Sequence, residues 1–241
     1  MVGIDSWAAI FSDLVADLDT LSFEGSAAHV YNPLVYAAEP HNTYFRRYGR
    51  APRHVLLVGM NPGPWGMAQT GVPFGEVAAV RDWLKIGGRV GEPAHPHPKK
   101  PVTGFACHRS EVSGRRVWAW AQHAFVTPER FFERFLVFNY CPLLFLDEAG
   151  RNLTPDKLRA AVRRPMQAAC DRALIRAVEL LGPSYVVGIG RYAESQIVRA
   201  LRGRPLRTGC ITHPSPANPR ANSGWEATIT RELREIGITI S

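Results

Sequence analysis

Four short apolar runs place the strongest limit on how this chain can fold. They lie at residues 54–58, 134–139, 185–189 and 210–212, and segments with helical patterns separate them. Buried strands that alternate with helices need crossover connections, which make neighbouring strands parallel and cover both faces of the sheet. The sequence therefore predicts an α/β fold of three layers, α/β/α, around a central four-stranded, mainly parallel sheet.

Apolar spacing and helix-start signals predict the helices between these strands. The expected helices are 5–21, 40–50, 76–86, 113–125, a short one from Pro128, one capped by Thr154 and running to about Leu181, 193–201, and a last one opened by a capping box at 223–226. Residues 87–112 lack periodicity and are expected to form a long functional loop. With 241 residues, 46% of them hydrophobic, the chain is expected to fold as one domain, 1–241.

Polar or flexible residues follow each predicted strand. Asn61, Asn139, the pair Gly190 and Arg191, and His213 all come just after an apolar run. The carboxyl ends of parallel strands meet at one edge of the sheet, where ligands bind in such folds. A single asparagine after a strand is usually a turn former, but several such residues converging on one edge indicate a site.

The loop after the first strand has an unusual composition. Residues 59–75, GMNPGPWGMAQTGVPFG, hold five glycines and three prolines. This composition suits a fixed loop that another molecule approaches closely, so we expect a pocket wall. A phosphate-binding loop of the P-loop type is excluded, because no Gly-Lys-Ser/Thr follows.

A second loop, 213–222, reads HPSPANPRAN and has proline at 214, 216 and 219. Proline fixes the backbone, so Ser215 is expected in a rigid turn where its hydroxyl or backbone N–H can contact a phosphate. Rigidity is useful in a loop that must push into DNA.

Three motifs together resemble a known family. GMNPGPWGMAQTGVPFGEV at 59–77, FNYCPL at 138–143 and HPSPANPRAN at 213–222 resemble, in order and spacing, the single-strand-selective monofunctional uracil-DNA glycosylases, a branch of the uracil-DNA glycosylase superfamily. The likeness extends over residues 25–235. It implies excision of flipped-out uracil from DNA by hydrolysis of the N-glycosidic bond, leaving an abasic site.

The resemblance also implies roles for the residues at the strand ends. Asn61 is expected to place the attacking water, since an amide can orient water but cannot take its proton near neutral pH. His213 is expected to hydrogen bond O2 of uracil and stabilise the departing anion. Asn139 is expected to read the Watson–Crick edge, accepting from N3–H and donating to O4, and thereby to reject cytosine.

Three residues of the first loop complete the expected base pocket. Phe74 would stack on the base, and the backbone of Met60 and Gly63 would line the pocket. Superfamily members strict for uracil have a bulky aromatic side chain where this chain has Gly63. We therefore expect 5-hydroxymethyluracil to be accepted as well as uracil.

Seven residues are expected to contact DNA: Arg191, Pro214, Ser215, Pro216, Ala217, Asn218 and Arg220. One of them departs from the family pattern, because relatives carry an arginine where this chain has Ala217, at the tip of the second loop. A methyl group fills little of the space left by a flipped base. Either Arg220 or the loop 87–112 compensates, or double-stranded substrates are opened less readily.

Net charge and residue usage agree with a DNA partner without requiring it. The net charge of +8 suits a polyanion, although a merely basic soluble enzyme has the same composition. We expect single- and double-stranded DNA carrying uracil or C5-substituted uracil as the partner.

The chain has no signal peptide and no apolar stretch of membrane-spanning length, so we expect a cytoplasmic monomer, associated with the nucleoid in a bacterium.

No metal and no cofactor are expected. The four cysteines are widely spaced without a C-x-x-C pair, and are interpreted as reduced core residues: Cys107, Cys141, Cys170 and Cys210. His95 and His97 lie close together, but no Cys or acid completes a ligand set. No lysine lies in the three motifs, so Schiff-base chemistry and strand cleavage are not expected.

Two other functions remain open at this level. The chain could be a catalytically weak or inactive damaged-DNA-binding module of the same fold. It could also hydrolyse free nucleosides, although the motifs lack the carboxylates or metal that ribose binding needs.

Overall fold

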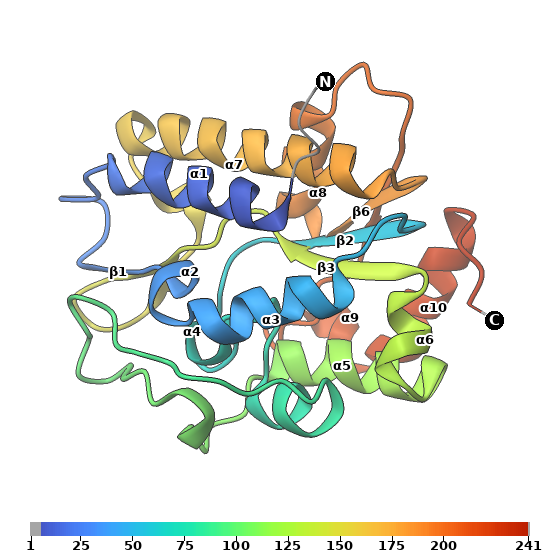
Figure 1. Cartoon of the computed structure of the whole chain (residues 1–241), viewed down its shortest axis with the longest axis horizontal. Helices are drawn as coiled ribbons and strands as arrows, with labels where there is room; N and C mark the ends of the chain where they lie inside the picture. The colour runs from blue at the N-terminus through green and yellow to red at the C-terminus, as the bar shows by residue number, and fades with distance from the viewer. Residues whose placement is uncertain (1–5, 241) are drawn as a thin grey trace.

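The computed structural model describes residues 6–240, and a four-stranded parallel sheet forms its centre (Figure 1). The strands are β2 (Val55–Gly59), β3 (Phe135–Asn139), β6 (Tyr185–Ile189) and β7 (Arg207–Ile211), arranged in the order β3-β2-β6-β7. All three pairings between them are parallel. The predicted parallel sheet is confirmed.

Helices cover both faces of this sheet. In Figure 1, α1 (Trp7–Asp19), α7 (Ala160–Leu181) and α8 (Arg191–Ala200) lie above it. The lower layer contains α5 (Val112–Phe125), α6 (Pro128–Phe132) and α10 (Trp225–Glu235). Every residue of β2, β3 and β6 is buried, as a sheet covered on both faces requires. The three-layer α/β/α prediction is therefore confirmed.

The edge strand β7 begins earlier than its apolar run indicates. The sequence predicts 210–212, whereas pairing with β6 begins at Arg207. Arg207 and Thr208 are exposed, because this strand has a neighbour on only one side. Apolar composition therefore marks only the buried end of β7.

A small antiparallel sheet was not predicted. It contains β1 (His29–Tyr31), β4 (Leu144–Leu146) and β5 (Asn152–Leu153) in the order β1-β4-β5. Each strand has only two or three residues, which is too short to show a period in the sequence. Its consequence for function is that β5 and the turn after it reach the polar edge of the main sheet.

The remaining elements are short apart from α3. They are α2 (Pro33–Tyr36), α3 (Ala38–Tyr48), α4 (Met67–Thr70), α9 (Pro219–Asn222), a π-helical turn at Ala79–Trp83, and 3₁₀ turns at Gly104–Ala106 and Pro155–Lys157.

Ser6 caps α1 by accepting from the backbone N–H of Ala9 at 3.2 Å. The expected start of that helix at residue 5 lies outside the described residues. The predicted loop 87–112 has no regular structure except the turn at Gly104–Ala106 and the first residue of α5.

The long helix α7 does not start at Thr154, so this boundary was predicted wrongly. Thr154 precedes the 3₁₀ turn Pro155–Lys157, after which Leu158 and Arg159 are extended. Leu158 is buried in the core and holds this extended link in place. The helix then begins at Ala160.

The predicted capping box at 223–226 is also wrong. Helix α10 begins at Trp225, with Gly224 before it at a φ of 104°. The Ser223 hydroxyl donates to the carbonyl of Arg220, and Glu226 accepts from His123 at 2.8 Å. Both side chains have partners other than the backbone N–H groups that a capping box would satisfy.

Of the predicted helix 76–86, only residues 77–83 are helical, and they do not form a regular α-helix. Their centre is the π-helical turn Ala79–Trp83. The Glu76 carboxylate accepts from the backbone N–H of Ala79 at 2.9 Å, so Glu76 caps this segment.

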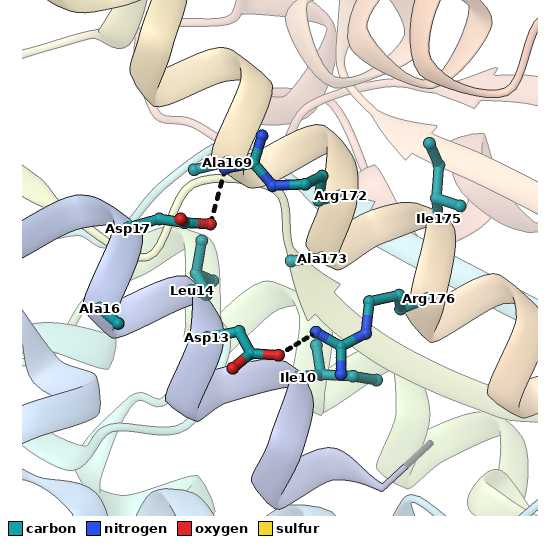
Figure 2. Close-up of a pocket in the computed structure, with 10 residues that line it drawn as sticks. All are labelled: Ile10, Asp13, Leu14, Ala16, Asp17, Ala169, Arg172, Ala173, Ile175 and Arg176. Carbon is teal, nitrogen blue, oxygen red and sulfur yellow. Dashed lines mark hydrogen bonds and ion pairs between the residues drawn. The ribbon is translucent and has the colours of Figure 1, made fainter. Parts of the chain in front are cut away.

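Helices α1 and α7 are joined at the surface, away from the polar edge of the sheet, by two ion pairs (Figure 2). Arg172 lies 2.7 Å from Asp17, and Arg176 lies 2.6 Å from Asp13. These pairs border a surface groove, and their exposed positions limit their contribution to stability.

Within residues 6–240, no helix is both long and apolar enough to span a membrane.

The four cysteines are free thiols, but only two are core residues. Cys141 and Cys170 are buried, whereas Cys107 and Cys210 are partly exposed. The prediction of four core cysteines is therefore correct for two of them.

A buried histidine fastens the first loop to α3. His41 is 2% exposed, and its Nδ1 donates to the carbonyl oxygen of Gly71 at 2.8 Å. Gly71 has a φ of 71°, a conformation that favours glycine. Burial lowers the pKa of His41 to about 4, so the side chain is neutral near pH 7.

We predict that His41 makes the protein less stable in acid. Its folded pKa of about 4 lies below the usual 6.5, so its stabilising contribution is present above pH 6.5 and is lost as the pH falls toward 4. Between about pH 7 and pH 4.5, the wild type should lose on the order of 2 kcal/mol more unfolding free energy than His41→Gln. Urea unfolding at both pH values measures this difference, and equal losses would contradict the prediction.

Candidate active site

The polar strand ends meet in one pocket of about 260 Å³ at the carboxyl edge of the main sheet. Its walls are formed by Met60, Asn61, Gly63, Pro64, Phe74, Glu111, Ser113, Asn139, Asn152, Thr154, His213 and Ser215. All six residues that the sequence places around a base are among them, so residues up to 153 positions apart in the chain share one cavity.

Asn61 presents a free acceptor. Its Nδ2 donates to the carbonyl oxygen of Leu143 at 3.1 Å, which fixes the orientation of the amide. Its Oδ1 is buried and has no hydrogen-bond partner. A group with an O–H donor, such as a water molecule, can therefore be oriented at this oxygen.

Asn139 presents a second free acceptor at the end of β3. The residue is buried, and its Nδ2 lies 3.1 Å from the sulfur of Met67, while its Oδ1 is buried without a partner. Gly59 pairs with Asn139 in the sheet register, and a Cβ at Gly59 would overlap both the Asn139 amide and the Phe74 ring. Glycine at this position allows the two side chains to approach each other.

Phe74 is held in a strained conformation. Its φ is 53°, which is unusual for a bulky residue. Its carbonyl oxygen accepts from the Trp118 indole at 3.0 Å and from the backbone N–H of Glu76 at 2.7 Å. Strain of this kind persists where the surroundings enforce it, often at functional sites. The Phe74 ring centroid lies 6.4 Å from that of His213, across the pocket.

His213 is a neutral donor. Its Nδ1 accepts from the backbone N–H of Ser215 at 3.1 Å, so the proton of the neutral ring resides on Nε2. Burial lowers the pKa of His213 to about 4. Near pH 7 the pocket therefore has an uncharged Nε2–H group, a detail that the sequence alone did not give.

Glu111 is a pocket residue that the sequence analysis missed. It precedes α5, and its carboxyl group lies against Gly63 and Gly66, where a Cβ on either glycine would overlap it. Its Oε2 is buried and has no hydrogen-bond partner. Burial, with a smaller contribution from Glu76, raises the pKa of Glu111 to about 7. The only signal in the sequence was its place at the end of a long aperiodic loop.

Ser113, Asn152 and Thr154 were also missed. Asn152 belongs to β5 and Thr154 follows it, so both depend on the small antiparallel sheet that the sequence did not reveal. The absence of a side chain at Gly63 does not leave the open space that we expected, because the Glu111 carboxyl group lies beside this glycine.

The second loop is fixed by its own hydrogen bonds and by Arg116. Asn218 donates to the carbonyl oxygen of His213 at 3.1 Å, and the Ser215 hydroxyl accepts from the backbone N–H of Ala217 at 3.2 Å. Arg116 donates to the carbonyl oxygen of Pro214 at 2.9 Å, and Pro214 is buried. The loop is therefore a preformed projection beside the pocket.

The residues expected to contact DNA are not all free to do so. Pro216, Ala217 and Arg220 are exposed, and Ser215 lines the pocket. Arg191 lies 2.8 Å from Glu194, which neutralises part of its charge. Buried Pro214 positions its neighbours and offers little surface of its own.

The long loop supplies further positive charge near the pocket. Lys100 and Arg109 lie 4.8 Å and 4.5 Å from the ring centroid of Trp65, which follows Gly63 and Pro64. Among the described residues, no group of three or more His, Cys, Asp or Glu side chains is arranged to hold a metal ion. The polar groups that line the pocket include the amides of Asn61 and Asn139, a neutral imidazole and a buried carboxyl group.

Comparisons with known proteins agree with the geometry. The sequence model of the uracil DNA glycosylase superfamily matches residues 46–234. The single-strand selective monofunctional uracil-DNA glycosylase of Rattus norvegicus is 50% identical over 227 residues, 93% of this chain and 82% of the relative. Its counterpart in Bos taurus is 50% identical over 224 residues, 92% of this chain and 82% of the relative.

A solved structure agrees with the fold. Wild-type SMUG2 of Pedobacter heparinus matches with a TM-score of 0.65 and 16% identity, covering 94% of this chain and 96% of that chain. The superfamily model matches residues 46–234. All six residues that the sequence places around the base, His213 included, lie within this range. The chain belongs to the uracil DNA glycosylase superfamily and, within it, to the family of single-strand selective monofunctional uracil-DNA glycosylases.

Proposed function

We propose that this protein is a monofunctional DNA glycosylase that removes uracil from DNA in base excision repair. The observation that carries the proposal is the set of hydrogen-bonding groups that the pocket presents: the Oδ1 and Nδ2 of Asn139 and the Nε2–H of His213. Uracil has the complementary pattern of an acceptor at O2, a donor at N3 and an acceptor at O4. Family membership supports the same reaction.

The binding mode follows from these groups. Asn139 Oδ1 accepts from N3–H and Nδ2 donates to O4, while Phe74 stacks on the ring. Cytosine has the opposite pattern at N3 and C4, so it would leave the buried amide of Asn139 unpaired. The base must leave the DNA stack to reach the pocket, at a cost of a few kcal/mol.

The reaction breaks the bond between C1′ of the sugar and N1 of uracil. Positive charge develops on the sugar and negative charge on the base, and the Nε2–H of His213 donates to O2 of the departing anion. The Oδ1 of Asn61 orients a water molecule whose oxygen then bonds to C1′. The proton that this water loses neutralises the departed uracil anion, directly or through solvent. Because Asn61 cannot act as a base, bond breaking precedes the attack of water. The product is an abasic site in an uncut strand.

The protein acts on DNA as a monomer, on single and double strands, and accepts 5-hydroxymethyluracil as well as uracil. Exposed Pro216 and Ala217 form the tip of the rigid loop that enters the duplex. Arg220, Lys100 and Arg109 supply charge for the phosphates. Gly63 has no side chain to exclude a C5 substituent, so the Glu111 carboxyl group, which lies beside this glycine, is the group that such a substituent meets.

The first prediction from the proposed function concerns activity itself. A uracil-containing oligonucleotide incubated with the protein should break at the uracil position only after alkali treatment, because the enzyme leaves an abasic site. Strand scission before alkali would contradict the monofunctional mechanism. Binding without any cleavage after alkali would favour an inactive DNA-binding module, and release of base from free uridine would favour a nucleoside hydrolase.

The second prediction separates binding from chemistry. Asn61→Ala and His213→Ala should each lower the rate of uracil release by about 10²–10³-fold, as removal of a group that acts in the transition state does. Both variants should still bind DNA that contains an abasic site. Single-turnover kinetics and gel-shift titration measure the two quantities, and a parallel loss of binding would argue against these roles.

The third prediction concerns Ala217. An arginine at this tip fills more of the space left by a flipped base, so Ala217→Arg should raise activity on double-stranded uracil DNA relative to single-stranded DNA. The measured quantity is the ratio of kcat/KM on the two substrates. Ala217→Ser is the matched control with nearly unchanged volume. If Ala217→Arg leaves the ratio at the wild-type value, the loop tip does not limit duplex opening.

A further inference from the structure

The carboxyl group of Glu111 has no structural partner that explains its position. It lies against the backbone of Gly63 and Gly66 within the base pocket, and its Oε2 is buried without a hydrogen bond. Leaving a buried polar group unpaired is costly, so such a group usually has a functional reason. The mechanism derived above uses Asn61, Asn139 and His213 but does not use Glu111.

The orientation of Asn139 indicates which edge of the base faces Glu111. Its Nδ2 points to the sulfur of Met67, the residue next to Gly66. In the proposed binding mode, this Nδ2 donates to O4, so the O4 edge of the pyrimidine faces the segment from Gly63 to Met67. C5 is the ring atom next to C4, and a substituent on it projects from the same edge. The carboxyl group that covers Gly63 and Gly66 therefore lies on the C5 side of the base.

We propose that Glu111 is a specificity-determining residue that selects the C5 substituent of the bound pyrimidine by accepting a hydrogen bond from a hydroxyl group there. The inference rests on the proposed function, because it assumes that a uracil-type base occupies the pocket. It assigns the discrimination at C5 to a carboxyl side chain as well as to the absence of a side chain at Gly63.

The chemistry of the substituents follows from this arrangement. A hydroxymethyl group on C5 can donate its O–H to Oε2, which satisfies both groups. The methyl group of thymine fills the same space but cannot donate, so it leaves the carboxyl group buried and unpaired. Uracil has only a hydrogen at C5, so space remains beside the carboxyl group for a water molecule that can donate to it, whereas a methyl group would displace that water. The site should therefore favour uracil and hydroxyl-bearing analogues and disfavour thymine.

The environment of Glu111 suits this task. Burial and the neighbouring Glu76 raise its pKa to about 7, so near pH 7 it is ionised only about half of the time and adds less negative charge beside a departing anionic base than an ordinary carboxylate would. A neutral or an ionised carboxyl group can each accept from a hydroxyl donor. Glu76 itself caps Ala79 and lies outside the pocket lining.

The experiment compares three otherwise identical single-stranded oligonucleotides that carry uracil, 5-hydroxymethyluracil or thymine at one position. Wild type, Glu111→Leu and Glu111→Gln are assayed for kcat/KM on each. In Glu111→Leu, the ratio of 5-hydroxymethyluracil to uracil should fall about tenfold or more, and the ratio of thymine to uracil should rise. Glu111→Gln keeps an acceptor oxygen of similar shape, so its ratios should stay within about threefold of the wild type.

Glu76→Gln is the control for a buried carboxyl group outside the pocket, and its ratios should match the wild type. Equal losses on all three substrates in Glu111→Leu, unchanged ratios, or the same ratio change in Glu76→Gln would overturn the inference. Thermal unfolding of each variant identifies loss of fold, and if Glu111→Leu is unfolded, Glu111→Ala gives the same comparison. Absence of uracil release by the wild type would refute the proposed function instead, whereas uracil release without 5-hydroxymethyluracil release would refute only the role of Glu111.

Discussion

The close pairing of β2 with β3 is the constraint on which the site depends. Their parallel register sets Gly59 opposite Asn139, and Asn139 lines the pocket together with Met60 and Asn61, which follow β2. Because Gly59 has no side chain, Asn139 and Phe74 can approach each other over it. The backbone of the same region is tied further by the bond from Cys141 N–H to the carbonyl oxygen of Met60 at 2.9 Å. The Asn139 amide, to which we assign recognition of the base, is thus positioned by sheet hydrogen bonds.

The site stores free energy in unsatisfied groups. Six buried side-chain polar atoms in residues 6–240 have no hydrogen-bond partner, and three of them belong to Asn61, Asn139 and Glu111. Each unpaired buried group costs about 1–3 kcal/mol, which a ligand with matching donors recovers. Together with the positive φ of Phe74, this gives a pocket that is ready for its ligand before binding. Burial of the large apolar core offsets this free-energy cost, because every residue of β2, β3 and β6 is buried.

The sequence predicted those features that depend on long, regular patterns. The parallel sheet followed from buried runs such as 185–189, which coincides with β6 residue for residue. The convergence of Asn61, Asn139 and His213 followed from the direction of parallel strands. Features decided by tertiary contacts were not predicted. Thr154 has the signals of a helix cap, but the burial of Leu158 delays the start of α7.

The same limit explains the missed residues of the pocket. Glu111 and Asn152 come from segments without period, and their positions are set by packing against the first loop and by the small sheet. The protonation of His213 was also beyond the sequence, because it depends on the backbone N–H of Ser215.

The electrostatic state of the pocket connects these observations. Burial holds His213 neutral and raises the pKa of Glu111 to about 7, so in the proposed binding mode the base lies beside an uncharged imidazole and a carboxyl group that is only about half ionised near pH 7. A protonated imidazole would bind O2 more strongly, but its burial would cost more than a neutral ring. A neutral donor with fixed direction requires no such desolvation, and it interacts more strongly as negative charge grows on the leaving base. In the proposed mechanism, the pocket therefore interacts more favourably with the breaking bond than with the intact nucleotide.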